Sequence, residues 1–137
     1  MHVTMSENEQ VINVIEKFFQ IGKTKNLAVL REIQLDDTRF SSFSDVPPHD
    51  LKDFATTIVL EELRFVSISD YDYQIKNPKI SVFDNTAIVA FELLQKGMAV
   101  DNKAFTGTMI TIEGRATFVL IKNSSWKIVH IHLSKIN

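Results

Sequence analysis

Apolar residues recur at helical spacing early in the chain and in strand-like runs later on. Ser6-Glu7-Asn8-Glu9 has the form of a capping box, and the apolar residues that follow it are spaced by three and four. This pattern predicts a helix that begins at Ser6 and ends at Gly22, where a left-handed cap would stop it. The apolar positions of this helix are Val11, Val14, Ile15, Phe18 and Phe19.

Two further helices are predicted before the strands. Asn26 can cap a short helix that turns Leu27, Leu30 and Ile33 inward. After Pro47-Pro48, Asp50 can cap a third helix. The residues of this helix predicted to face the core are Leu51, Phe54, Ala55, Ile58 and Val59.

From about Arg64 the pattern changes to Val, Ile, Phe, Thr and Tyr in runs that are separated by turn residues. It predicts four strands, over 71–83, 87–98, 105–121 and 126–133. Their short connections favour antiparallel neighbours, and Pro78 indicates an edge strand or a bulge. Helices followed by an antiparallel meander predict an α+β fold.

Composition narrows the classes of protein. The chain has 137 residues, which fit a single domain over residues 1–137, and 15 Lys and Arg against 17 Asp and Glu give a net charge of −2. This balance argues against nucleic acid and anionic membrane surfaces as partners. There is no cysteine, so disulfides and thiolate zinc sites are excluded. With no secretory signal pattern and no long apolar run, we expect a cytoplasmic location.

The stretch from Gly114 to Lys122 and the run Trp-Lys-Ile-Val-His-Ile-His-Leu-Ser that begins at Trp126 resemble the nuclear transport factor 2-like superfamily. They are most similar to SnoaL-like domains and to the association domain of calcium/calmodulin-dependent kinase. The resemblance implies a cone-shaped, strongly curved antiparallel sheet wrapped around the N-terminal helices, as in cystatin-like folds. It also implies a pocket at the open end and a homodimer through the outer face of the sheet. It implies no single activity.

Strand alternation then predicts which side chains face the cone. Val129, Ile131 and Leu133 form a purely apolar row, so we assign it to the concave face. In the association domain the position that matches Leu133 also faces the pocket. The same alternation, applied to the neighbouring strands, predicts that Glu92, Arg115 and Thr117 face inward and are the polar groups of a ligand site. The aromatic residues expected around that site are Phe18, Phe40, Phe43 and Phe54.

Glu92 and Arg115 have two interpretations. They are either a structural ion pair or rim charges, or Glu92 is a catalytic acid/base and Arg115 orients a substrate oxygen. The association domain carries arginines at the positions that match Glu92, Thr117 and Leu133, so this chain departs from that pattern.

The outer face is predicted to be apolar as well, and therefore to bind a second copy of the chain. The residues expected at that interface are Phe91, Phe118, Leu120, Trp126, His130 and His132. The two histidines lack a third ligand, so we expect no metal and no cofactor.

These features lead to one main hypothesis and two alternatives. The main one is a small-molecule pocket protein of the SnoaL-like type, a homodimer that binds an apolar or weakly polar ligand in its cone. The first alternative is a proton-transfer isomerase, hydratase or cyclase. The second is a non-catalytic module whose role is dimerisation. An open pocket lined by polar groups would favour the pocket protein or the proton-transfer enzyme. A cone filled by aromatic rings would favour the dimerisation module.

Overall fold

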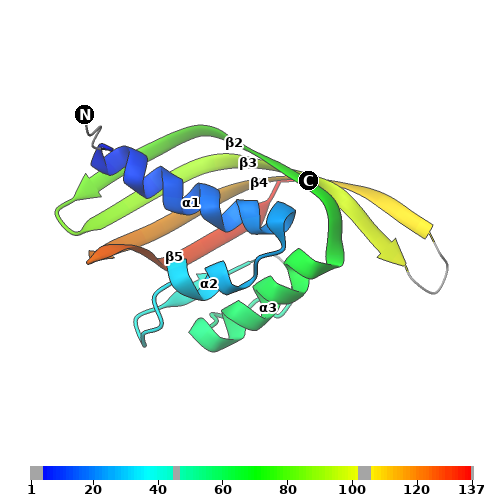
Figure 1. Ribbon diagram of the computed structural model, residues 1–137, viewed down its shortest axis with the longest axis horizontal. Helices are drawn as coiled ribbons and strands as arrows, with labels where there is room; N and C mark the ends of the chain where they lie inside the picture. Colours follow the sequence, from blue (N-terminus) through cyan, green and yellow to red (C-terminus); the bar gives the residue numbers. More distant parts are fainter. Residues whose placement is uncertain (1–4, 45–46, 102–105, 137) are drawn as a thin grey trace.

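In the part of the chain that the structure describes, a curved, open five-stranded sheet carries three helices on one of its faces (Figure 1). The computed structural model describes residues 5–44, 47–101 and 106–136. The strand order is β1-β5-β4-β3-β2, antiparallel except that β1 runs parallel to β5. The α+β class is confirmed. The elements are α1 (Glu7–Thr24), α2 (Ala28–Ile33), β1 (Ser41–Phe43), α3 (Phe54–Ser67), β2 (Ile68–Phe83), β3 (Thr86–Asp101), β4 (Thr106–Asn123) and β5 (Ser125–Lys135).

The first helix begins as its sequence predicts and ends later. The Glu9 amide donates to Ser6 Oγ at 3.2 Å, which confirms the N-cap. The predicted end at Gly22 is wrong: α1 continues to Thr24, and Lys25 takes the left-handed conformation and donates its amide to the Ile21 carbonyl. Gly22 is instead buried against the ring of Tyr71, where a side chain would not fit.

The other two helices start later than predicted. The N-cap of α2 is Leu27 rather than Asn26, and it makes no side-chain capping bond. Asp53 rather than Asp50 caps α3, accepting from the Thr56 amide at 2.9 Å. Because α3 begins at Phe54, Leu51 precedes it and is exposed, and Ala55 and Val59 lie on its exposed side.

The strands follow the predicted order. The expected irregularity at Pro78 is confirmed by a register shift between Lys76 and Lys79, with Asn77 at a φ of 51°. Asp84 and Ser124 take positive φ in the two described hairpin turns. Phe105, the expected start of the third strand, lies outside the described residues.

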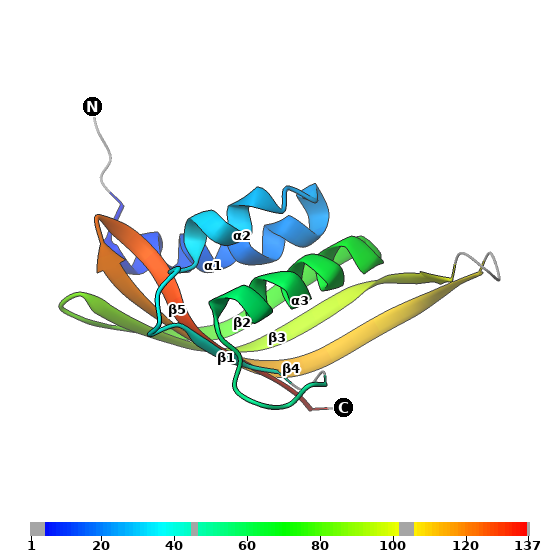
Figure 2. The same ribbon diagram turned by 90° about the horizontal axis from the view of Figure 1, so that it is seen from below.

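Aromatic rings join the helices to the sheet. Phe18 of α1 contacts Phe65 of α3 and Phe118 of β4 edge to face, with ring centroids 5.6 and 5.4 Å apart. Phe19 of α1 packs on the same Phe118 ring, which also stacks on Phe91 of β3. All three helices therefore cover one face of the sheet (Figure 2), which we call the inner face. The opposite face is the outer face.

The inner face carries different residues from those predicted. Ala116 lies opposite Leu133 and Phe118 lies opposite Ile131, so the prediction for β4 was one residue out of register. A bulge adds a second change, because Val119 pairs with His130 whereas Leu120 pairs with Ile128, which leaves Val129 as the extra residue. Along β5, the inner-face residues before the bulge are therefore Trp126 and Ile128, and those after it are Ile131 and Leu133.

The close contact at Gly22 yields a stability prediction. Gly22→Ala raises helix propensity by about 1 kcal/mol. The added methyl group would overlap the buried Tyr71 ring, and overpacking costs roughly 1–3 kcal/mol. We expect a net loss of about 1 kcal/mol in the free energy of unfolding, measured by urea denaturation.

Gly107→Ala is the matched control. Its methyl group would meet only the flexible end of Met98, at 3.0 Å, on an exposed strand, so we expect a change within about 0.5 kcal/mol. A Gly22→Ala protein more stable than the parent would contradict the packing described for α1.

Candidate functional site

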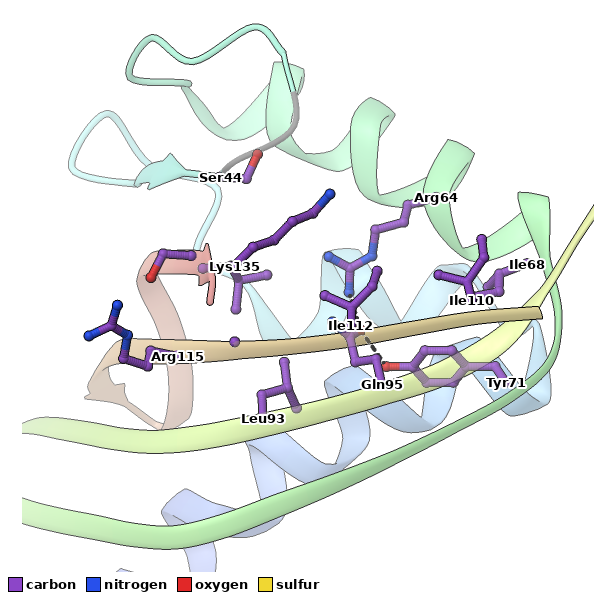
Figure 3. A pocket seen from close by; sticks show the side chains of 13 residues that line it. Ser44, Arg64, Ile68, Tyr71, Leu93, Gln95, Ile110, Ile112, Arg115 and Lys135 are labelled. Atoms are coloured by element: carbon purple, nitrogen blue, oxygen red, sulfur yellow. Dashed lines mark hydrogen bonds between the residues drawn. The ribbon is translucent and has the colours of Figure 1, made fainter. Parts of the chain in front are cut away.

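Two adjoining cavities lie between α3 and the end of the sheet that carries the C-terminal part of β5. The larger, of about 330 Å³, lies between α3, β1 and the segment before α3; the smaller, of about 100 Å³, lies between α3 and the strands β2 to β5. Ser44, Arg64 and Leu133 line both, so the two spaces form neighbouring lobes of one site. Figure 3 shows the smaller lobe, with Arg64 descending from α3 towards the sheet.

Glu61 is the one carboxyl group among the described residues that line the cavities. It comes from the inner side of α3, where Gln34 Nε2 donates to its Oε2 at 2.7 Å. Desolvation raises the pKa of Glu61 to about 7, against the smaller opposing effects of the Gln34 hydrogen bond and the Arg64 charge. The group can therefore gain or lose a proton near neutral pH.

A hydrogen-bonded network fixes the wall of the smaller lobe. Gln95 Oε1, on β3, accepts from the Tyr71 hydroxyl at 2.8 Å and from Arg64 Nη2 at 3.2 Å (Figure 3). Burial raises the pKa of Tyr71, so its hydroxyl remains a hydrogen-bond donor at neutral pH. The guanidinium of Arg64 is thus held by a neutral partner.

The larger lobe has a polar wall made by β1 and the start of α3. Ser42 and Thr57 join their hydroxyl groups at 2.6 Å, and Lys52 pairs with Ser42 through two backbone hydrogen bonds. Lys52 as a whole residue is only 5% exposed, and its ammonium group donates to the Asp50 carbonyl at 3.2 Å. A buried ammonium therefore lies in the same wall as Glu61 and Arg64.

The polar residues predicted for the ligand site lie elsewhere. Glu92 and Arg115 are direct partners across β3 and β4, but both are exposed and on the outer face, where Asn77 donates to Glu92. Thr117 also lies on the outer face. Arg115 reaches only the rim of the smaller lobe, with its guanidinium directed away from Arg64 (Figure 3). The one-residue error in register explains why all three were assigned to the wrong face.

The predicted aromatic residues have mixed positions. Phe18 is fully buried in the core, and Phe40 packs edge to face on Phe54 at 5.6 Å; none of the three lines either cavity. Phe43 does line the larger lobe, from the edge strand β1. The rings therefore support α3 and leave the cavity open.

The sequence contained a signal for Glu61. Phe54, Ile58, Glu61 and Phe65 are spaced by four, three and four, so this carboxyl group lies on the apolar side of its helix. A charged residue at such a position is costly unless it has a role. Neither Glu61 nor Arg64, one turn further on, was predicted, because the sequence pattern was interpreted from the apolar positions of this helix alone.

Most of the residues predicted for the dimer interface are in the core of this chain. Phe91, Phe118, Leu120 and Trp126 are 0–5% exposed on the inner face, where the helices cover them. The prediction for these four is wrong, for the reasons of register and bulge given above. His130 and His132 do lie on the outer face.

The outer face still has apolar character. Ile88 and Phe43 are 41% and 37% exposed, and three half-buried apolar residues lie on the same face. These three are Leu94, Val119 and Ile121. Nearby, the Ser41 hydroxyl is 2.8 Å from His130 Nδ1, and partial burial together with the neighbouring His132 lowers the pKa of His130.

Two general features complete the description. In the described part of the chain, no three His, Asp or Glu side chains come together as a metal-binding group would require. No helix over the same residues has the length and apolar character needed to cross a membrane.

Solved structures with this fold are numerous. A nuclear transport factor 2-like superfamily protein from Salmonella enterica has a TM-score of 0.79 and 18% identity, over 93% of this chain and 89% of its own. A candidate dehydratase of the NTF2-like family from Streptomyces avermitilis has a TM-score of 0.80 and 17% identity, over 94% and 96%. The S. rosetta CaMKII hub has a TM-score of 0.71 and 16% identity, over 97% and 99%.

These likenesses concern the fold, because the identities are low. No curated protein matches the chain. The family model of the SnoaL-like domain matches residues 11–137, nearly the whole length, and the chain therefore belongs to the SnoaL-like domain family.

Proposed function

We propose that this protein binds a small, largely apolar molecule in the cavity beneath α3 and transfers a proton to or from it at Glu61. The observation that carries the proposal is a carboxyl group in the wall of an apolar cavity with a pKa of about 7. A general acid or base is most effective when its pKa lies near the working pH. Glu61 replaces Glu92 as the candidate acid/base.

The surroundings of Glu61 suit this role. Gln34 occupies Oε2, and within the described chain no hydrogen bond is made to Oε1, so that oxygen remains for a ligand. Arg64 lies one turn away on the same helix, where it could polarise a substrate oxygen. The names of structural neighbours, a candidate dehydratase and a candidate ketosteroid isomerase, agree with proton-transfer chemistry in this fold.

The proposal can be tested with a nitrobenzisoxazole, a neutral apolar probe for carboxylate bases. A base removes the ring C–H proton, the N–O bond breaks, and a coloured phenolate forms. We expect turnover by the parent protein that increases with pH through about 7, as Glu61 ionises. Glu61→Gln should lower kcat/KM by about 10²–10⁴-fold.

Glu62→Gln is the control, because Glu62 pairs with Arg31 at 3.7 Å, outside the cavity. It should retain the parent rate. Equal rates in the parent and in Glu61→Gln would refute proton transfer by Glu61.

The raised pKa of Glu61 also predicts a pH dependence of stability. The folded protein holds this proton with a pKa of about 7, against an ordinary value of 4.5 in the unfolded chain. The contribution of Glu61 to stability is therefore full below about pH 4.5 and is lost as pH increases to about 7. We expect urea denaturation to show a free energy of unfolding that is roughly 2–3 kcal/mol lower at pH 8 than at pH 5. Glu61→Gln should not show this contribution. A loss of the same size in Glu61→Gln would contradict the burial of this carboxyl group.

We also propose that the protein forms a homodimer through its outer face. The support is the exposed apolar surface around Ile88 and Val119, together with neighbours that are association and hub domains of a kinase. His130 and His132 lie at the edge of this surface. The interface residues proposed from sequence are thus replaced by outer-face residues, apart from the two histidines.

Light scattering can test the dimer. We expect about 31 kDa for the parent, twice the 15.6 kDa of the chain. Val119→Arg should give a folded monomer, because it places a charge within the apolar surface. Thr111→Arg, at an exposed position on the same strand, should remain a dimer. A monomeric parent protein would exclude the proposed interface.

A further inference from the structure

Positively charged side chains predominate around the cavity, although the net charge of the whole chain is negative. The whole sequence has a net charge of −2, yet the described residues that line the two lobes include four cations and a single carboxyl group, Glu61. Two of the cations, Lys52 and Arg64, are in the walls, whereas Arg115 and Lys135 are exposed and the Arg115 guanidinium is directed away from Arg64. A cleft lined by one sign of charge between apolar walls concentrates ligands of the opposite sign.

The two cations in the walls have neutral partners. Arg64 donates to the Gln95 side-chain carbonyl, and Lys52 donates to the Asp50 backbone carbonyl. None of the ion pairs formed by the described residues includes either of them. Both cations therefore have carbonyl groups as their hydrogen-bond partners, and an anionic ligand would supply a further opposite charge. Arg64 can offer a bidentate pair of N–H donors, which fits a carboxylate.

The smaller lobe adds an apolar compartment next to Arg64. Five side chains supply its apolar surface, and Figure 3 shows Ile110, Ile112 and Leu93 extending from the sheet beneath the guanidinium. The five are Ile68, Leu93, Ile110, Ile112 and Leu133. A ligand held by its charged group at Arg64 would place its remainder against these side chains.

We propose that the ligand of this cavity is an amphipathic organic monoanion, a carboxylate bound by Arg64 with its apolar body in the lobe between α3 and the sheet. This inference rests on the proposed function, because it names the class of molecule that the same site takes. The anionic group accounts for Arg64 and Lys52, and the apolar body accounts for the rest of the lining.

Binding of such an anion is linked to the proton on Glu61. A neutral Glu61 does not repel the incoming carboxylate, whereas an ionised one does, so affinity should decrease as pH increases through about 7. The other titratable or charged groups that line the lobes are Lys52, Arg64, Tyr71, Arg115 and Lys135. The Tyr71 hydroxyl stays protonated throughout this range because burial raises its pKa.

Calorimetric titration with phenylacetate and with phenylacetamide, its neutral analogue, tests this inference. We expect phenylacetate to bind at least about tenfold more tightly at pH 6, and to lose up to about tenfold in affinity per pH unit above 7. Arg64→Met should abolish the preference for the carboxylate while binding of the amide is retained, which also shows that the variant folds. Arg31→Met, at an exposed position of α2 outside the cavity, should behave as the parent.

The outcomes separate the two proposals. Equal affinity for acid and amide, no binding of the acid, or an unchanged preference in Arg64→Met would overturn the anion assignment. If Glu61-dependent turnover of the nitrobenzisoxazole is nevertheless observed, the proton-transfer proposal survives that result. A pH dependence of acid binding that persists in Glu61→Gln would show that another group supplies the linked proton, and the assignment to Glu61 would be overturned.

Discussion

The contact of Phe118 with Phe18 and Phe19 decides which face of the sheet is covered. Phe118 lies in the middle of β4, fully buried, and its ring meets both α1 rings and Phe91 on the next strand. Because side chains alternate along a strand, burying Phe118 places Arg115, Thr117 and Val119 on the opposite side. The same contact therefore determines the helix layer, the outer face and the location of the cavity.

The order of elements could be predicted from sequence because each element has its own signal. The Ser6 capping box and the irregularity at Pro78 are local signals, and the structure contains both. The pairing of one strand with the next is not local. Both rows of β4 contain apolar residues, so a one-residue shift looked acceptable, and nothing in the sequence marks Val129 as a bulge.

The position of the cavity follows from how α3 is attached. Its first residue, Phe54, packs on Phe40, and near its other end Phe65 packs on Phe18 and Tyr71. Between these two aromatic anchors, the inward positions include Thr57 and Glu61, which are polar. The helix is therefore fixed to the core at both ends and borders open space along its middle. Sequence reasoning placed aromatic rings inside the cone, whereas they hold α3 above it.

The polar groups of the cavity are difficult to explain by stability. A leucine or methionine at position 61 would avoid the desolvation of a carboxyl group, and apolar residues in place of Arg64 and Lys52 would avoid enclosing two cations. Each of the three is instead supported by neighbours that orient it: Gln34 for Glu61, Gln95 for Arg64 and the Asp50 carbonyl for Lys52. Supporting contacts of this kind keep a group in place for a ligand. An acidic group that ionises near neutral pH and two cations, arranged around an apolar lobe, are groups that hold a charged molecule and exchange a proton with it.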